Sequence, residues 1–382
     1  EMNSPEGGFY TAEDADSEGV EGKFYLWTPD QVKGVLGEDD GEYFCRLYDI
    51  SEQGNFEGKS IPNLLDRMLD RRAEAGERES PLQNERVDVL RQKLFDAREK
   101  RIHPFKDDKI LTSWNGLIIA ALARGGWVLG DVKFTHAAEK AVEFLLKNLR
   151  SKEGRLLARY REGEAAYPAY LDDYAFLAWG LLELYQATFQ VGYLEDAIGL
   201  TREMRNLFWD PEDGGFYFTA KEGNEDLGTR AKEIADMALP SGNSVAAWNL
   251  LHLARLTGNS ELKNTAQRQL HAFGGAAAEA PQAYTFYLCA LDFSLGPPQE
   301  IVVATEKDDP KTREILEVMR AKYLPRAIIL QNQPGREGER LAAIAPNAAG
   351  KIPLDGTPAV YICENYACQE PVTNPKELAE QI

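Results

Sequence analysis

The sequence is poor in cysteine, histidine and basic residues. Its 382 residues include four cysteines and four histidines, and 43 lysines and arginines face 62 aspartates and glutamates, which gives a net charge of −19. Four cysteines are too few for a disulfide framework, so we expect a reducing, cytoplasmic setting. A surface this acidic repels phosphate backbones, which argues against nucleic acid as a partner.

Long hydrophobic runs are absent as well. The longest apolar stretch, residues 117–130, is interrupted by Arg124 and two glycines, and it is shorter than the roughly 20 residues that span a bilayer. No basic and then apolar signal segment opens the sequence, so we expect no membrane partner. Hydrophobic residues still make up 43% of the chain, enough for one large core or for two domains.

Motifs for nucleotides and metals are missing too. No P-loop and no G-x-G-x-x-G follows a predicted strand, and the acidic segment 12–21 lacks the full spacing of a calcium loop. Cys363 and Cys368 are not spaced as C-x-x-C and have no histidine nearby, so buried or idle thiols are favoured over a redox or metal role. We therefore expect no cofactor and no metal site.

A short repeat is present instead. The segments PEGGFYTAED, KEGRLLARYR and EDGGFYFTAK begin at residues 5, 152 and 212. Each is an acidic turn, then glycine, then an alternating run that is typical of a β-hairpin arm. A pair of helical patterns precedes each of the two later copies, and the period from Gly154 to Gly214 is about 60 residues.

A unit of helix, helix and hairpin predicts antiparallel helix pairs arranged in a ring. The nearly apolar helices at 174–189 and 245–256 would form the inner wall, and the amphipathic helices around Ala137 and Glu195 would face outward. The predicted fold class is therefore mainly α, an (α/α)6-toroid. Since a repeat unit cannot bury its apolar face alone and the first copy has no helix pair before it, we expect a toroid truncated at its N-terminus.

Composition shifts place the domain boundaries. Residues 1–296 would form the partial toroid, with an insertion at about 37–100 that contains an exposed linker and a charged helix. Just before the insertion, Thr28 and Pro29 are typical of a helix start. The GPPQ segment at residue 296 then precedes three short apolar strands and a helix, which predicts a small α/β domain with parallel strands at 297–382.

Polar clusters stand where the three predicted inner helices begin. In a ring these helix N-termini point to one end, so the clusters would converge on a funnel whose helix dipoles favour oxygen-rich ligands. Helix capping is the plain alternative, but it uses one residue per helix and leaves the rest of each cluster unexplained. The clusters comprise Asp107, Asp108, Trp114 and Asn115, then Asp172, Asp173 and Tyr174, then Ser241 and Asn243.

The acidic segment 12–21 adds Asp14 and Asp16 to the candidates. Two carboxylates at suitable spacing can serve as general acid and base on a sugar, so the catalytic candidates are Asp14, Asp108 and Asp173. His252 lies inside an apolar helix and is interpreted as a core residue, which leaves His103 as the histidine nearest the funnel. The predicted substrate-binding residues are Asp16, Asp107, Trp114, Asn115, Asp172, Tyr174, Ser241 and Asn243.

Five stretches of the sequence resemble a known family. These motifs are similar to those of the YyaL-type thioredoxin-domain-containing proteins, a group with a spermatogenesis-associated animal member. The resemblance implies a thioredoxin-like domain followed by an (α/α)6-toroid akin to N-acylglucosamine 2-epimerases and six-hairpin glycosidases. This chain lacks that family's thioredoxin-like domain and first toroid helices, so we expect an upstream thioredoxin-like domain as a partner. The matching stretches are residues 7–28, 107–123, 170–189, 238–258 and 363–378.

The leading functional hypothesis is a carbohydrate-related toroid. Its funnel would bind a sugar or similar polyol, with Trp114 or Tyr174 stacked on a ring face, and its carboxylates would support isomerisation or hydrolysis. One alternative is a non-catalytic toroid that binds a ligand or partner and serves the attached thioredoxin-like domain. A further alternative makes the polar clusters purely structural.

Overall fold

The computed structural model describes residues 2–65, 85–221, 229–306, 309–364 and 367–382. The chain divides into two compact units, which we call the helical unit (Glu1–Thr11 with Lys109–Ile382) and the inserted unit (Ala12–Asp108). The expected insertion at 37–100 falls within the inserted unit. Most of its predicted linker lies outside the described residues.

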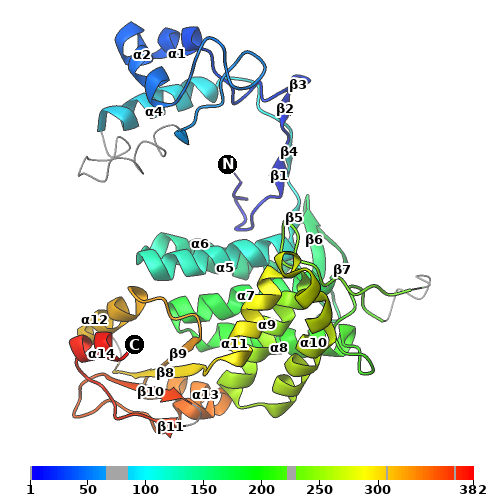
Figure 1. Cartoon of the computed structure of the whole chain (residues 1–382), viewed down its shortest axis with the longest axis vertical. Helices are drawn as coiled ribbons and strands as arrows, with labels where there is room; N and C mark the ends of the chain where they lie inside the picture. The colour runs from blue at the N-terminus through cyan, green and yellow to red at the C-terminus, as the bar shows by residue number, and fades with distance from the viewer. Residues whose placement is uncertain (1, 66–84, 222–228, 307–308, 365–366) are drawn as a thin grey trace. The chain divides into compact units, whose positions relative to one another are not determined.

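The helical unit begins with an array of antiparallel helix pairs (Figure 1). Helices α5, α7, α9 and α11 pack side by side, and α6, α8 and α10 each cover the inner helix that precedes them. The predicted mainly α architecture, with inner and outer helices, is confirmed by this order. The helices are α5 (Thr112–Leu129), α6 (Val132–Asn148), α7 (Leu171–Thr188), α8 (Val191–Phe208), α9 (Gly242–Thr257), α10 (Ser260–Glu279) and α11 (Thr285–Leu295).

Glycine sets the closest contact between two inner helices. A Cβ added at Gly116 of α5 would lie 2.5 Å from the carbonyl carbon of Phe176 on α7, and one at Gly180 would lie 2.8 Å from the Gly116 carbonyl oxygen. Backbones can approach this closely only where no side chain stands between them. The outer helix α6 is buried on one face only, through residues such as Ala138, Ala141 and Leu145.

The sequence repeat has a structural cause. In each copy, the residue two positions after the glycine donates its backbone N–H to a buried side chain near the start of an inner helix. Phe9 bonds Asn115 Oδ1 at 2.8 Å, Leu156 bonds Tyr174 Oη at 3.1 Å, and Phe216 bonds Asn243 Oδ1 at 2.8 Å. We call these three contacts the hairpin clasp.

The two asparagines of the hairpin clasp bond in both directions. Asn115 Nδ2 donates to the Phe9 carbonyl at 3.0 Å, and Asn243 Nδ2 donates to the Phe216 carbonyl at 2.9 Å. Both side chains are 1% exposed. A buried amide used in this way imitates one rung of a β-ladder and satisfies a backbone that water cannot reach.

The glycines of the repeat allow the hairpin turns to lie on outer helices. Gly7 and Gly214 have φ angles of 117° and 77°, a conformation that other residues rarely adopt. A Cβ on Gly7 would lie 3.0 Å from the Lys140 carbonyl oxygen of α6, and one on Gly214 would lie 3.2 Å from the Arg268 carbonyl oxygen of α10. The turn at Gly7 therefore lies on α6 and its hairpin is bonded to α5, while the turn at Gly214 lies on α10 and its hairpin is bonded to α9.

The short strands near the inner helices form hairpins as expected. Strand β6 (Leu157–Arg161) pairs with both β5 (Ile110–Leu111) and β7 (Glu164–Pro168), in antiparallel fashion. The outer helices receive further support from the same segments, since Arg150 beside β6 bonds Glu203 of α8 at 3.1 Å.

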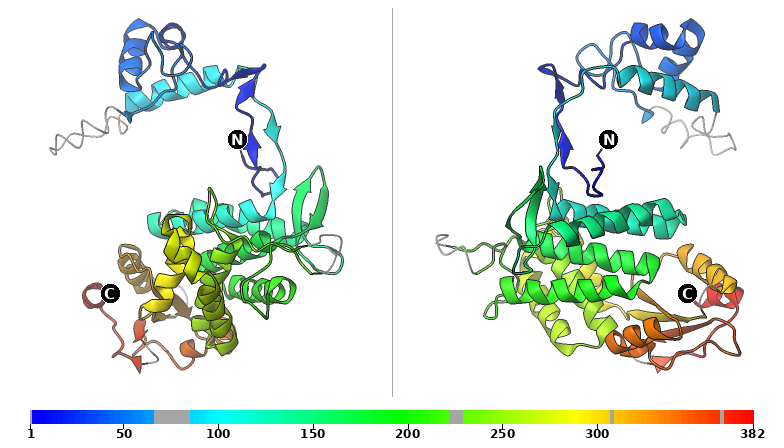
Figure 2. Two further views of the ribbon diagram at one scale, coloured as in Figure 1. Left: turned by 45° about the vertical axis from the view of Figure 1, so that its right-hand side comes forward. Right: turned by 180° about the vertical axis from the view of Figure 1, so that it is seen from behind.

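The C-terminal part of the helical unit is a four-stranded sheet with helices on its faces (Figure 2). Ile301 and Val303 face α12 and α14, while Val302, Ile328 and Leu330 face the helical array. The elements are β8 (Gln299–Ala304), α12 (Pro310–Arg320), β9 (Ala327–Asn332), α13 (Arg336–Ile344), β10 (Ala359–Glu364), β11 (Ala367–Cys368) and α14 (Pro375–Gln381).

Two expectations for this sheet are wrong. Strands β8 and β9 are parallel, as expected. Strand β10 pairs with the other edge of β8 and runs antiparallel to it. Cys363 and Cys368, expected as idle thiols, form a disulfide. The register of β10 with β11 places them directly opposite each other, which four scattered cysteines in a sequence do not reveal.

The inserted unit contains three helices among its described residues, packed through Trp27, Val32, Phe44 and Leu90. The predicted start of α1 is confirmed, since Thr28 and Gln31 form a capping box with Pro29 first in the helix. Strands β1 and β4 pair, so the ends of the unit lie side by side. The elements are β1 (Ala12–Glu13), β2 (Asp16–Ser17), β3 (Val20–Glu21), α1 (Pro29–Leu36), α2 (Glu38–Leu47), α4 (Glu85–Arg98) and β4 (Lys106–Asp107).

The hairpin clasp predicts a large loss of stability in Asn243→Ala. The substitution leaves the N–H and carbonyl of Phe216 buried without a partner, so we expect unfolding to become easier by about 2–4 kcal/mol. Urea unfolding followed by circular dichroism measures this. Asn148→Ala is the control, because Asn148 only bonds a carbonyl of its own helix and should cost less than about 1 kcal/mol. Equal losses in the two variants would contradict the role of the clasp.

Candidate functional site

The N-termini of the inner helices are joined by two buried carboxylates. Asp173 at the start of α7 accepts hydrogen bonds from the backbone N–H of Ser113 on α5 and of Tyr170, at 2.9 and 2.8 Å. Asp236 accepts from Ser241 at the start of α9 and from Phe286 on α11, both at 2.8 Å. The predicted convergence of these helix starts at one end of the array is therefore present, and we call this end the rim.

Most of the predicted side chains at the rim are used within the fold. Asn115, Tyr174 and Asn243 form the hairpin clasp. Ser241 caps α9 by accepting from the Ser244 N–H, and Asp173 is only 3% exposed. Burial raises the pKa of Asp173 to about 7, while its hydrogen bonds from Tyr170 and Ser113 oppose that shift. A ligand contact by any of these groups stays a prediction.

Asp172 is the rim carboxylate with the most chemical freedom. The pKa of Asp172 is raised to about 6, chiefly by burial and also by the negative charge of Glu233, while a hydrogen bond from the Gly242 N–H opposes the shift. A Cβ at Gly242 would lie 2.2 Å from Asp172 Oδ1, so a side chain there would displace this carboxylate. Trp114 on the first turn of α5 is 44% exposed and presents an indole at the same end of the array.

The remaining predicted residues belong to the inserted unit. Asp14 Oδ1 accepts from the Asp16 N–H at 3.2 Å, which makes a local turn. Asp107 pairs with Ala12 in the β1–β4 ladder, and Asp108 ends the unit. His103 lies here too, beside the Phe24 ring. The roles proposed for Asp14, Asp16, Asp107 and Asp108 stay predictions.

A second candidate lies along the inner helices, in a cavity of about 450 Å³. Polar groups from α5, α7, α9 and α11 line it, and the segment after α12 forms its remaining wall. A cavity of this size fits a small ligand. We call it the inner-wall cavity; its lining residues are Arg124, Leu182, Glu183, Gln186, Trp248, His252, Thr285, Leu288, Cys289, Asp292, Tyr323, Leu324, Pro325 and Ala327.

His252 packs against two aromatic rings, that of Trp248 in the inner-wall cavity and that of the buried Phe293 beside it. Its ring centroid lies 4.1 Å from that of Trp248 and 4.1 Å from that of Phe293. Nδ1 lies 2.9 Å from the Trp248 carbonyl oxygen, and since a carbonyl can only accept, Nδ1 carries the proton and Nε2 is an acceptor. Burial lowers the pKa of His252 to about 4, so the ring is neutral at physiological pH.

Glu183 supplies the carboxylate of the inner-wall cavity. Trp179 Nε1 donates to one of its oxygens at 3.1 Å, and Arg124 Nη1 lies 3.6 Å from the other. Burial raises the pKa of Glu183, and the nearby Arg124 guanidinium opposes this. The cavity therefore combines a proton acceptor, a carboxyl group whose pKa is raised and an exposed cation.

Sequence reasoning missed the inner-wall cavity. It interpreted His252 as a core residue and did not select Glu183 or Arg124. Polar residues on otherwise apolar helices could have indicated this cavity. Trp248 and His252, for example, are four residues apart and share one face of their helix. Helix starts drew attention instead, because caps and ligand sites share the same residue types.

Within the described ranges no cluster of three or more histidine, cysteine or acidic side chains is placed to hold a metal ion. Nor is any helix there both long and apolar enough to cross a bilayer.

The comparisons with curated sequences find relatives along nearly the whole chain. The chain is similar to spermatogenesis-associated protein 20. The rat protein is 32% identical over 410 residues and the human protein 31% over 407, in each case 97% of this chain and 51% of the relative. An uncharacterized protein of Caenorhabditis elegans is 29% identical over 413 residues, 99% of this chain and 55% of the relative. The chain thus spans about half the length of the curated relatives it matches. No family model matches it.

Similar solved structures come from carbohydrate-active proteins. A cellobiose 2-epimerase from Bacillus thermoamylovorans aligns with a TM-score of 0.39 at 16% identity, covering 70% of this chain and 68% of its own. A family 105 glycoside hydrolase from C. acetobutylicum aligns with a TM-score of 0.36 at 15% identity, covering 69% and 67%. Both scores are low, so functional assignment depends on the side chains of this chain.

The charge state of His252 can be tested by NMR. Because its pKa lies near 4, the ring should stay neutral and protonated at Nδ1 from pH about 8 down to about 5. Since the folded pKa is below the unfolded value, this group's contribution to stability is lost as pH falls from about 6.5 to 4. A change in the His252 nitrogen shifts centred near pH 6.5 would contradict the assignment.

Asp172→Asn tests the raised pKa at the rim. The wild-type carboxyl has a higher pKa folded than unfolded, so its contribution to stability falls as pH rises from about 4 to about 6. The variant removes a partly desolvated charge, and we expect it to be more stable than wild type by about 1 kcal/mol above pH 7, after allowing for solvent screening. The difference should vanish near pH 4. Urea unfolding of both proteins between pH 4 and pH 7 measures this difference in stability. A difference that does not change with pH would contradict the raised pKa of Asp172.

Proposed function

We propose that the helical array binds a sugar or similar polyol in the inner-wall cavity. The observation that carries this is the joint presence there of the Trp248 indole, the Glu183 carboxyl group and the neutral His252 ring. Aromatic faces cover the apolar faces of sugar rings, and carboxylate and guanidinium groups bond hydroxyls. The proposed ligand is therefore still a sugar or polyol, as expected from the sequence. The side chains that best support its binding lie along the inner helices and not at the rim.

Acid/base chemistry would use Glu183 and His252. His252 Nε2 would accept a proton from a hydroxyl, or from a carbon next to a carbonyl, and a protonated Glu183 would return a proton elsewhere on the ligand. Isomerisation and hydrolysis both need such a pair. Asp173 at the rim and, separately, Asp14 and Asp108 of the inserted unit stay further proposals for the acid and base.

A non-catalytic role is the alternative. The Arg124 guanidinium lies 3.6 Å from Glu183, and a charge this close favours the ionised carboxylate, which binds hydroxyls but cannot donate a proton. In that case the cavity would hold a ligand for the benefit of the rest of a longer protein. Membership of the spermatogenesis-associated protein 20 family, with an attached thioredoxin-like domain, belongs to this proposal and rests on the sequence similarity.

Matched tryptophan variants locate the site. A panel of monosaccharides and disaccharides is titrated against the protein, with binding followed by calorimetry. We expect Trp248→Ala to weaken binding at least tenfold, because the ring platform is lost, and Trp114→Ala at the rim to leave it unchanged. Unfolding curves confirm that both variants fold. Loss of binding in Trp114→Ala alone would move the site to the rim, and no saturable binding of any sugar would remove the proposal.

Glu183→Gln separates the enzyme from the binding module. It keeps the shape and the hydrogen bond from Trp179 but cannot exchange a proton. If the pair is catalytic, the variant should retain sugar binding and lose turnover of that sugar by at least 100-fold. Turnover is followed by proton NMR of the bound sugar class. Equal turnover in wild type and variant would leave the cavity as a binding site only.

A further inference from the structure

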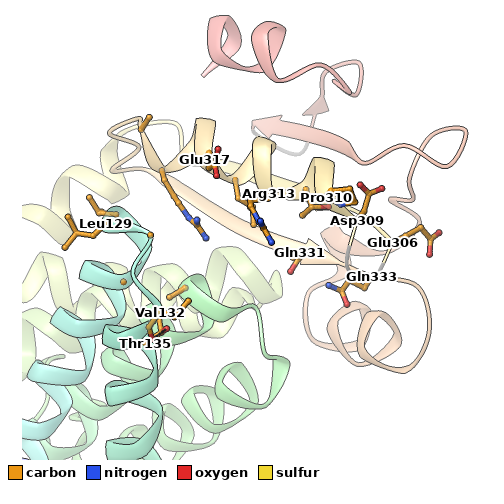
Figure 3. Close-up of a pocket in the computed structure, with 18 residues that line it drawn as sticks. Leu129, Val132, Thr135, Glu306, Asp309, Pro310, Arg313, Glu317, Gln331 and Gln333 are labelled. Carbon is orange, nitrogen blue, oxygen red and sulfur yellow. Dashed lines mark hydrogen bonds between the residues drawn. The ribbon is translucent and has the colours of Figure 1, made fainter.

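A larger cleft, of about 1020 Å³, is lined by residues that belong to neither the rim nor the inner-wall cavity (Figure 3). One wall is helix α12 of the sheet domain, and the other is the turn that joins α5 to α6. Nothing described above uses it. We call it the α12 cleft.

The α12 cleft opens at the carboxyl edge of two parallel strands. Glu306 follows β8, Gln331 lies near the end of β9, and α12 is the crossover helix between these strands. Ligands in open α/β sheets bind outside the carboxyl ends of the strands, where loops and helix starts leave a crevice. The cleft therefore has the position of a ligand site as well as the volume of one.

Two arginines of α12 line the cleft. Arg313 and Arg320 are seven residues apart, which is about two helical turns, so they share one side of α12 and stand about 10 Å apart along it. The Arg320 guanidinium lies 4.8 Å from the Trp127 ring, and its buried Nε has no hydrogen-bond partner among the residues that the structure describes. For Arg313, no salt bridge is present with any residue that the structure describes.

The opposite wall is apolar and open to water. Leu129 and Val132, both labelled in Figure 3, are 68% and 62% exposed, and neighbouring Val128 is 54% exposed. Exposed large apolar side chains facing two guanidinium groups across one cleft match a ligand that is itself apolar in the middle and charged at its ends.

The acidic residues of the cleft do not neutralise both arginines. Asp309 caps α12 by accepting from the Lys311 N–H at 2.8 Å. Burial lowers the pKa of the Arg320 guanidinium, and the negative charge of Glu317 opposes that shift. Glu306 lies at the strand end of the cleft. The cleft thus carries three carboxylates and two guanidinium groups, and among these Arg313 is the group available to bind an anion.

We propose that the α12 cleft binds an elongated organic dicarboxylate. Arg313 and Arg320 hold the two carboxylates, since a guanidinium pairs with a carboxylate through two parallel N–H bonds. Leu129 and Val132 cover the carbon chain between them. This site is independent of the sugar proposal.

Decanedioate is the probe, with butanedioate and decanoate as its short and singly charged counterparts, titrated into the full chain by calorimetry. Decanedioate should bind saturably and at least fivefold tighter than either counterpart, because only it reaches both arginines and covers the apolar wall. Arg313→Gln should weaken decanedioate about tenfold, the loss of one ion pair. Lys311→Gln, on the same helix but outside the cleft, removes an equal charge and should change nothing.

A second variant tests the apolar wall. Leu129→Asn, at an exposed turn position, should weaken decanedioate at least threefold and leave butanedioate unchanged. Trp248→Ala serves as a check on independence, since it should not affect decanedioate. No saturable binding of decanedioate, or equal weakening by Arg313→Gln and Lys311→Gln, would overturn the proposal; the latter result would mean unspecific charge attraction only.

Discussion

The arrangement of the helical unit depends on one buried contact made three times. Asn115, Tyr174 and Asn243 each lie in the first turn or so of successive inner helices, and each accepts a hydrogen bond from the backbone N–H of a hairpin residue that follows a repeat glycine. Burying that N–H without an acceptor would be costly, so each hairpin is fixed on its helix. The helices in turn are held together at their N-termini by Asp173 and Asp236.

This use of polar groups explains which part of the helical array retains side chains that can contact a ligand. At the rim, most amides and carboxylates already bond backbone groups, so their hydrogen-bonding capacity is largely spent on the fold. About three turns further along the inner helices, Glu183 and His252 line a cavity instead. Trp179 and Arg124 each contact one oxygen of Glu183, and the Nε2 atom of His252 is left as an acceptor for a ligand.

The periodicity of the sequence was enough to predict the helix pairs, the hairpins and the α/β end domain, because burial forces those patterns directly. The direction of β10 could not be predicted in this way, because a largely buried apolar strand has the same pattern whichever way it runs. The disulfide between Cys363 and Cys368 depends on register, which a single sequence does not show. The interpretation of His252 as a core residue agrees with its packing on Trp248 and Phe293, but the pattern of that helix does not by itself reveal the cavity on its other side.

The pairing of β1 with β4 has an evolutionary consequence. Residues 12–108 leave and rejoin the helical unit through a two-stranded stem, with Ala12 opposite Asp107. A module attached by adjacent ends adds almost nothing to the entropy of closing the host chain, whatever its own length. The inserted unit could therefore be gained, exchanged or lost in evolution while the helical unit kept its packing. Circular permutation is tolerated for the same reason where two chain ends lie close together.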